Sequence, residues 1–338
     1  FPHLMLRGKA IAYQEKNKSL KQRARDSALT STDSFGKLMK LPLVDITYEA
    51  ISKSPKARKI ASKITGVHEE APWPNFEKSV KTYIPKSIEN VTATDKTTGK
   101  VALFTGCYCR NNDAELANDL LKVFEHNNIE TRVILDDKCC GMPKLELGDL
   151  KTVEKTMHHN IKKFKKYVDE GYKIIAPVPS CVLMFKQELP LLFPDNNDIK
   201  SISKALCDPF EYLLMLHDQG KLKTNFTNDI GSVFYQVACH QRVQNIGQVT
   251  KKILELIPGT DVEALERCSG HDGTYGVKKE THEIAIKIAA PIVREYEKNS
   301  AQQFTSDCTL AAHHIVNAMG NKVMPTHPIS LVKQAYGI

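Results

Sequence analysis

Short apolar runs alternate with helix-period segments along the chain from residue 100 onward. Five runs are typical of buried strands, at 101–104, 131–135, 172–177, 232–237 and 262–265, and a sixth run at 304–307 takes the equivalent place in the second half. Apolar residues at helical spacing occupy 112–126, 149–171, 202–216, 249–256 and 278–299. This alternation predicts an α/β fold with parallel strands, in which ligands bind at the carboxyl ends of the strands.

Residues 1–70 show helical spacing and no strand-like run. The prolines on either side of Trp73 begin an extended connector that we expect to reach about residue 99. The chain is therefore predicted to divide into a helical arm with its connector (1–98), a first module (99–228) and a second module (229–338).

Cysteines follow the predicted strands at matching places in the two modules. The segments 108–138 and 240–267, which separate the first two cysteine positions of each module, are nearly equal in length. The segments 141–180 and 269–307, which precede the last cysteine, are nearly equal as well. Such spacing predicts an internal duplication, with two pseudo-symmetric cysteine-rich modules. The cysteines concerned are Cys107, Cys139, Cys140 and Cys181 in the first module and Cys239, Cys268 and Cys308 in the second.

The first module offers Cys107, Cys139, Cys140 and Cys181 as metal ligands, with Cys109 as a possible fifth. Soft thiolates select zinc or iron–sulfur clusters over hard cations. Zinc is usually held by CxxC pairs on short turns, whereas these thiolates come from three strand ends, and two of them are adjacent. This arrangement favours a larger object with several iron atoms. Cys207 falls inside the helix expected at 202–216 and is interpreted as a core thiol.

The second module departs from the first, because Ser269 stands where the adjacent second cysteine would be. Three thiolates remain, and histidines lie close to them in the sequence. Imidazole can replace thiolate on iron and binds zinc equally well. The alternatives for this site are a cluster with a histidine ligand, a structural zinc, or an iron with an open position. The candidate ligands here are Cys239, Cys268, Cys308, His240, His271 and His314.

Composition limits the class of protein. The 41% hydrophobic and 25% charged fractions are those of an ordinary soluble globular chain, and no apolar run approaches the ~20 residues that span a bilayer. An odd count of nine cysteines without a secretion signal favours reduced thiols in the cytoplasm. The chain begins with Phe1, so we expect a preceding segment.

The net charge of +8 belongs wholly to residues 1–99, which hold 18 Lys and Arg against 10 Asp and Glu. Basic residues are not interleaved with aromatic ones, which argues against nucleic-acid binding. Two interpretations stay open for this arm. It is either a docking face for an acidic partner or for the inner face of the cell membrane, or a set of solvated helix faces.

This cysteine pattern, given twice, resembles that of the cysteine-rich CCG-domain family, which is related to heterodisulfide reductase. The segments 106–108, 138–143, 180–181, 239–240, 273–280, 307–308 and 327–328 carry the likeness, which is greatest to the iron–sulfur C subunits of anaerobic glycerol-3-phosphate dehydrogenases. The resemblance implies one or two 4Fe-4S clusters and an upstream ferredoxin-like part. It also implies electron transfer between a flavoprotein dehydrogenase subunit and a quinone, thiol/disulfide or redox-protein acceptor.

The sequence therefore predicts the electron-transfer subunit of an oxidoreductase, one that does not itself bind the organic substrate. Two alternatives remain. One is a catalytic disulfide or persulfide reductase with an open iron site in the second module, and the other is a zinc-stabilised scaffold.

Overall fold

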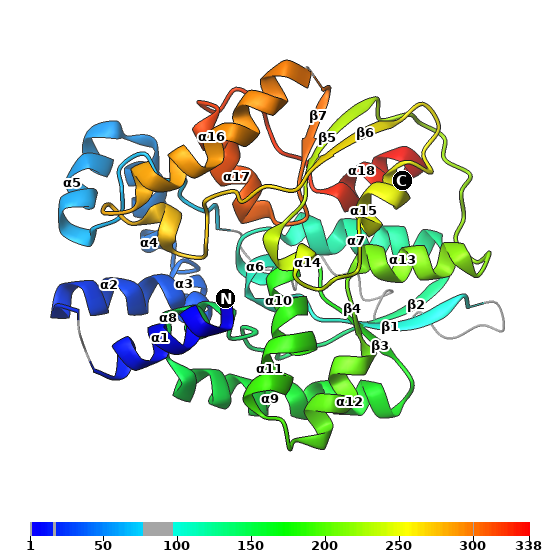
Figure 1. Cartoon of the computed structure of the whole chain (residues 1–338), viewed down its shortest axis with the longest axis horizontal. Coiled ribbons are helices and arrows are strands. Elements are labelled where there is room, and N and C mark those ends of the chain that lie inside the picture. Colours follow the sequence, from blue (N-terminus) through cyan, green and yellow to red (C-terminus); the bar gives the residue numbers. More distant parts are fainter. Residues whose placement is uncertain (1, 16–17, 77–96, 300) are drawn as a thin grey trace.

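The computed structural model describes residues 2–15, 18–76, 97–299 and 301–338. Two parallel sheets are surrounded by helices, and a helical arm lies along one side of them (Figure 1). The predicted α/β class with two modules and a helical arm is confirmed. Most of the predicted extended connector, residues 77–96, lies outside the described residues. In the described part of the chain, no helix is long and apolar enough to cross a membrane.

The described residues of the arm form five helices, several of which have ends set by local signals. Ser19 forms a capping box with Gln22, and Ser54 caps the last helix of the arm, which starts at Pro55. Gly66, at φ 74°, ends that helix in the left-handed conformation. The helices are α1 (Pro2–Gln14), α2 (Leu20–Thr30), α3 (Thr32–Leu38), α4 (Pro42–Lys53) and α5 (Pro55–Thr65).

The first module is built on a four-stranded parallel sheet of order β2-β1-β3-β4. Its strands are β1 (Gly99–Leu103), β2 (Ile129–Val133), β3 (Lys173–Ile175) and β4 (Leu206–Cys207). Its helices are α6 (Gly106–Asn111), α7 (Ala114–His126), α8 (Met142–Leu147), α9 (Leu150–Asp169), α10 (Pro179–Leu183), α11 (Leu189–Leu192), α12 (Asn197–Ala205) and α13 (Pro209–Asp218), with a π-helical turn at Met184–Glu188 between α10 and α11.

The second module repeats this plan with a three-stranded parallel sheet of order β6-β5-β7. Its strands are β5 (Ser232–Gln236), β6 (Asp261–Leu265) and β7 (Gln303–Thr305). Its helices are α14 (Cys239–Arg242), α15 (Val249–Leu254), α16 (His282–Asn299), α17 (Thr309–Ala318) and α18 (Pro328–Tyr336), with a 3-10 turn at Tyr275–Val277. In each sheet the first strand is flanked by the second on one side and the third on the other, so the topology agrees with the predicted duplication.

The single helix predicted at 202–216 is wrong. Helix α12 ends at Ala205, the edge strand β4 follows, and α13 begins at Pro209. Proline disfavours helical backbone in the residue before it, and Asp208 is extended, at φ −67° and ψ 146°. The Asp208 side chain instead caps α13 by accepting a hydrogen bond from the Phe210 N–H. Cys207 is therefore a buried residue of an edge strand and not of a helix.

One hydrophobic core runs through both modules. Helices α7, α13, α15 and α18 fill the space between the two sheets (Figure 1), and their buried side chains form one cluster with Val101 of β1 and Val233 of β5. The C-terminal helix α18 packs on α7 of the first module, where Lys333 Nζ lies 2.6 Å from Asp119 Oδ1. The division of the chain at residues 98 and 228 stays a proposal, because this core is shared.

Candidate metal centres

Four thiols of the first module meet at the carboxyl edge of its sheet. Cys107 lies in α6 directly after β1, Cys139 and Cys140 follow β2, and Cys181 lies in α10 after β3. Cys107 Sγ is 3.6 Å from Cys139 Sγ, and Cys140 is hydrogen-bonded to both Cys139 and Cys181. The structure thus brings together the four residues that we name the first thiol cage.

Two glycines let the backbone turn tightly around this cage. Gly106 has φ 64° and Gly141 has φ 96°, which is the left-handed region that residues with a Cβ rarely adopt. A Cβ on Gly106 would lie 3.6 Å from Cys181 Sγ, so this backbone passes directly beside the thiols. For Gly141, the glycine of the Cys-Cys-Gly motif, the requirement is the positive φ itself.

Hydrogen bonds between the thiols of the cage favour the ionisation of one thiol and oppose that of its neighbours. Hydrogen bonds from Cys107 and Cys140 lower the pKa of Cys139 well below its ordinary value. The hydrogen bond to Cys139, together with burial, raises the pKa of both Cys107 and Cys140. Four thiolates at this buried site need a cation beside them, which is the chemistry of a metal centre. Four thiolates are a donor set for a 4Fe-4S cluster and for zinc alike, and the 3.6 Å contact taken alone is near the ~3.8 Å between thiolates on one tetrahedral zinc.

The N-terminal arm closes over the cage, a contact that no sequence pattern predicted. Asp33 of α3 accepts a hydrogen bond from the Cys139 N–H at 2.8 Å, and Arg110 Nη2 lies 2.8 Å from the same carboxylate. Arg110 also pairs with Asp137, whose Oδ2 accepts the Gly106 N–H at 3.0 Å. Burial raises the pKa of Asp137 to about 6. No sequence pattern predicted a contact between Asp33 and Cys139, because the two residues are far apart in the chain and α3 carries no motif.

Cys109 points away from the other four thiols. It is fully buried and belongs to the core shared by the two modules, whereas Cys139, Cys140 and Cys181 belong to a separate cluster on the other side of the first sheet. Helical geometry explains this, because residues two apart on α6 do not share a face. A ligand role for Cys109 stays a prediction.

In the second module the structure brings Cys239 and Cys268 into a hydrogen bond. Cys239 starts α14 after β5, and Cys268 follows β6. The hydrogen bond from Cys239 lowers the pKa of Cys268 to about 6 and raises that of Cys239. Cys308 lies just before α17, where burial raises its pKa to about 11 and the nearest charged groups include Glu146 of the first module. All three thiols lie at the carboxyl end of their sheet, as predicted.

The predicted histidines take two different positions. His240 faces the first module, with Nδ1 2.7 Å from Ser180 Oγ and Nε2 4.0 Å from Glu146 Oε1. His271 and His314 lie together with ring centroids 6.0 Å apart, and the nitrogens of both rings are buried without a hydrogen-bond partner. Burial and the neighbouring His314 lower the pKa of His271 to about 3. Buried polar atoms without partners are expected where an ion or water completes a site.

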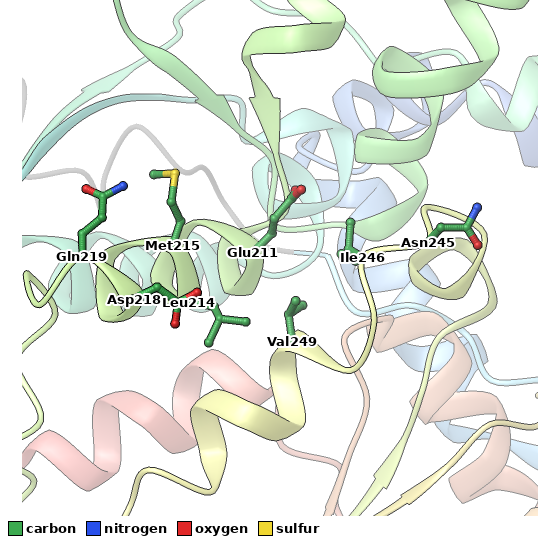
Figure 2. A pocket seen from close by; sticks show the side chains of 8 residues that line it. All are labelled: Glu211, Leu214, Met215, Asp218, Gln219, Asn245, Ile246 and Val249. Carbon is green, nitrogen blue, oxygen red and sulfur yellow. The ribbon is translucent and has the colours of Figure 1, made fainter.

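A surface hollow between the modules lies apart from the thiols. Figure 2 shows side chains of α13 and of the segment before α15 around it, including Glu211, Met215, Asp218 and Ile246. Glu211 is already paired with Lys186, whose Nζ is 2.6 Å from its carboxylate. The hollow has no thiol or histidine in its lining, so we derive no role in the metal chemistry from it.

Known proteins share this cysteine pattern. The model of the family described as "Cysteine-rich domain" (CCG) matches residues 101–186 and again 233–313. The C subunit of anaerobic glycerol-3-phosphate dehydrogenase from Escherichia coli K12 is 29% identical over 238 residues, which are 70% of this chain and 59% of that relative. Lactate utilization protein A of a Geobacillus strain (WCH70) is 26% identical over 54% of this chain and 76% of its own length.

A third relative comes from an archaeal enzyme. The B subunit of fumarate reductase (CoM/CoB) from Methanothermobacter marburgensis is 26% identical over 225 residues, which are 65% of this chain and 42% of that relative. These likenesses support iron–sulfur cluster binding and an association with oxidoreductases. The chain carries two copies of the cysteine-rich CCG domain and is homologous to the C subunit of anaerobic glycerol-3-phosphate dehydrogenase.

Proposed function

We propose that this chain is an iron–sulfur electron-transfer subunit of an oxidoreductase complex. The observation that carries the proposal is the first thiol cage, four converging thiols held at three strand ends. Cys107, Cys139, Cys140 and Cys181 would hold a 4Fe-4S cluster, and the bound cluster would accept and release single electrons. Cys139, Cys140 and Cys181 are buried, and Asp33 lies beside the cage.

The second centre would lie close to the first. Cys239, Cys268 and Cys308 supply its thiolates, and His271 and His314 supply nearby imidazoles with unused lone pairs. The 2.7 Å hydrogen bond between Ser180 and His240 joins residues adjacent to Cys181 and to Cys239. Short separation between centres favours electron transfer within the chain, so this contact supports a relay. A 4Fe-4S cluster with histidine ligation and a structural zinc are both open for the second centre.

The partners are part of the proposal and rest on the resemblance to the CCG-domain family. The donor would be a flavoprotein dehydrogenase subunit, and the acceptor a quinone or a redox protein. The chain would work in the cytoplasm, with the basic arm available for peripheral contact with the inner face of the membrane. Nothing in the charge pattern supports nucleic acid as a partner.

Metal analysis combined with EPR of anaerobically purified protein tests the proposal. We expect iron at about four atoms per filled cluster and a signal that appears on reduction. Cys181→Ser should remove the signal of the first centre. Cys109→Ser is the matched control, since its thiol lies in the shared core, and it should keep that signal. Zinc without iron in the unaltered protein would refute electron transfer and favour the zinc-stabilised scaffold.

A catalytic reductase is the second candidate, favoured by one observation. Cys268 is exposed, and its pKa of about 6 gives a thiolate at neutral pH, so a disulfide or persulfide could reach a nucleophile at the second centre. Addition of a small disulfide to reduced protein distinguishes the two. With an added chemical reductant, reduction of many equivalents of the disulfide by the unaltered protein supports catalysis, and no such turnover supports a pure carrier.

A further inference from the structure

The end of the helical arm is hydrogen-bonded to the second module. The segment after α5 pairs with the segment before α16, where the His68 N–H donates to the Val277 carbonyl at 2.9 Å and the Lys279 N–H donates to the Gly66 carbonyl at 3.0 Å. Arg25 Nη2 lies 2.6 Å from Glu280 Oε1 at the same place. These contacts bring His68 and Glu70 of the arm up to His282, the first residue of α16.

The three side chains present metal-binding atoms to one another. One ligand atom from each of His68, Glu70 and His282 lies within 4.8 Å of the other two. The two imidazole rings are stacked with centroids 4.0 Å apart. No cysteine belongs to this group, although the His282 ring lies 6.4 Å from the His314 ring of the second centre, between centroids.

Hydrogen bonds determine which ring nitrogens carry lone pairs. His282 Nδ1 lies 2.7 Å from the Gly276 carbonyl oxygen, so Nδ1 donates its proton and Nε2 is left with the lone pair. His68 Nδ1 accepts the Glu70 N–H at 3.2 Å, so its lone pair is at Nδ1. A histidine that ligates a metal almost always donates its other N–H in the way that His282 does.

We propose that His68, Glu70 and His282 bind a divalent transition-metal ion of the zinc class, which fastens the N-terminal arm to the second module. Two imidazoles and a carboxylate are an established donor set for zinc, and they exclude magnesium, which prefers oxygen ligands alone. Ligands around a tetrahedral zinc are about 3.4 Å apart, whereas the three atoms lie within 4.8 Å of one another, so any wider separation must shorten when the ion binds.

Two of the three side chains are free to make that movement. Glu70 is exposed and His68 half-buried, whereas His282 is only 2% exposed and is held by Gly276. When the ion binds, its bond to His68 Nδ1 replaces the 3.2 Å hydrogen bond that the Glu70 N–H donates to the same atom. Burial and the neighbouring His282 lower the pKa of His68, which favours the neutral ring that a metal needs.

Zinc binding to the cluster-loaded chain, after treatment with a chelator, tests this site by metal analysis and calorimetry. We expect His68→Gln and Glu70→Gln each to weaken zinc binding at this site by more than the ~10-fold that loss of a ligand's hydrogen-bond partner usually costs. Glu69→Gln is the matched control, because it removes the same charge from the adjacent position and should leave zinc affinity unchanged. His282 is left intact, since its substitution would disturb the buried start of α16.

Cobalt(II) in place of zinc reports the ligand type. We expect visible bands of a low-symmetry site without the sulfur-to-cobalt charge transfer of a thiolate site, and we expect them to be lost in the His68→Gln, Glu70→Gln double variant. Equal zinc affinity in the double variant and the unaltered chain would overturn the proposal, as would cobalt bound only through sulfur. Iron content and EPR signal are read in the same samples, so a failure of the zinc site is distinguishable from a failure of the electron-transfer function.

Discussion

Replacement of Asp208 by asparagine should stabilise the protein in a pH-dependent way. Asp208 of the first module is 2% exposed, and its carboxylate faces that of Asp307, which is 3% exposed and belongs to the second module. Burial, with the charge of Asp307 next, raises the pKa of Asp208 to about 7, and burial raises that of Asp307 to about 6. The modules therefore meet at two buried carboxyl groups that resist ionising together.

The direction of this pKa shift determines how the stability of the protein changes with pH. The folded state holds a proton on Asp208 more tightly than the unfolded chain, whose carboxyl has a pKa near 3.8. Stability therefore falls as the pH rises from about 4 to about 7 and stays lower above that range. Raising the pKa of Asp208 from 3.8 to about 7 lowers the free energy of unfolding at high pH by ~4 kcal/mol at most, because one pKa unit corresponds to ~1.4 kcal/mol. Because Asp307 contributes to this loss of stability, we expect Asp208 alone to account for about 2 kcal/mol of it.

Asparagine preserves the structure while removing the charge. It caps a helix as well as aspartate does, so the hydrogen bond from the Phe210 N–H to position 208 is retained. Asparagine also removes a negative charge from the start of α13, which lowers the stability of the variant by about 0.5 kcal/mol. This loss is smaller than the gain expected from removing the buried charge.

The assay is the apparent unfolding temperature of the metal-loaded protein, measured anaerobically between pH 5.5 and pH 8. We expect the Asp208→Asn protein to gain on the unaltered chain by roughly 2 °C over this range, since about half of the ~2 kcal/mol falls above pH 5.5 and ~1 kcal/mol corresponds to about two degrees in a chain of this size. Asp198→Asn, on the exposed first turn of α12, is the matched control and should show no such trend. The reasoning would be refuted if the difference in unfolding temperature between the variant and the unaltered chain did not change with pH, or if the variant were the less stable of the two at pH 8.

Two further substitutions test the surroundings of the metal centres. Asp33→Asn removes a negative charge next to Cys139 and should raise the midpoint potential of the first centre by on the order of 50 mV, measured by EPR-monitored redox titration, while the exposed Glu49→Gln should leave it unchanged. An unaltered potential in Asp33→Asn would show that Arg110 already cancels this charge. Gly270→Ala should destabilise the loop that holds Cys268, because φ is 78° and the new Cβ would lie 2.3 Å from the Ala285 carbonyl oxygen. Metal content of the second module should fall in Gly270→Ala but not in Gly220→Ala, where φ is 67° and no atom lies within 4 Å, and equal metal content in both variants would contradict this account.

Local contacts explain where sequence reasoning succeeded and where it failed. The strands before Cys107 and Cys139 were predictable, because short apolar runs between helix-period segments have few other ways to be buried. The break at Asp208-Pro209 was missed, although proline and an N-capping aspartate were a sufficient local signal. The hydrogen bond from the Cys139 N–H to Asp33 and the approach of His68 to His282 could not be predicted. They join segments far apart in the chain, and nothing in the spacing of residues encodes such contacts.

The sequence by itself determined the duplicated plan, with three strands in each half and a cysteine at the carboxyl end of each. The physical reason is that strand and helix periodicity are local properties, and parallel strands in one sheet end at the same edge. Only the tertiary structure decided which thiols face one another, that Cys109 turns into the shared core, and that the arm closes over the first thiol cage. Those outcomes depend on which faces of distant helices can be buried together, and side-chain packing selects them once the sheets have formed.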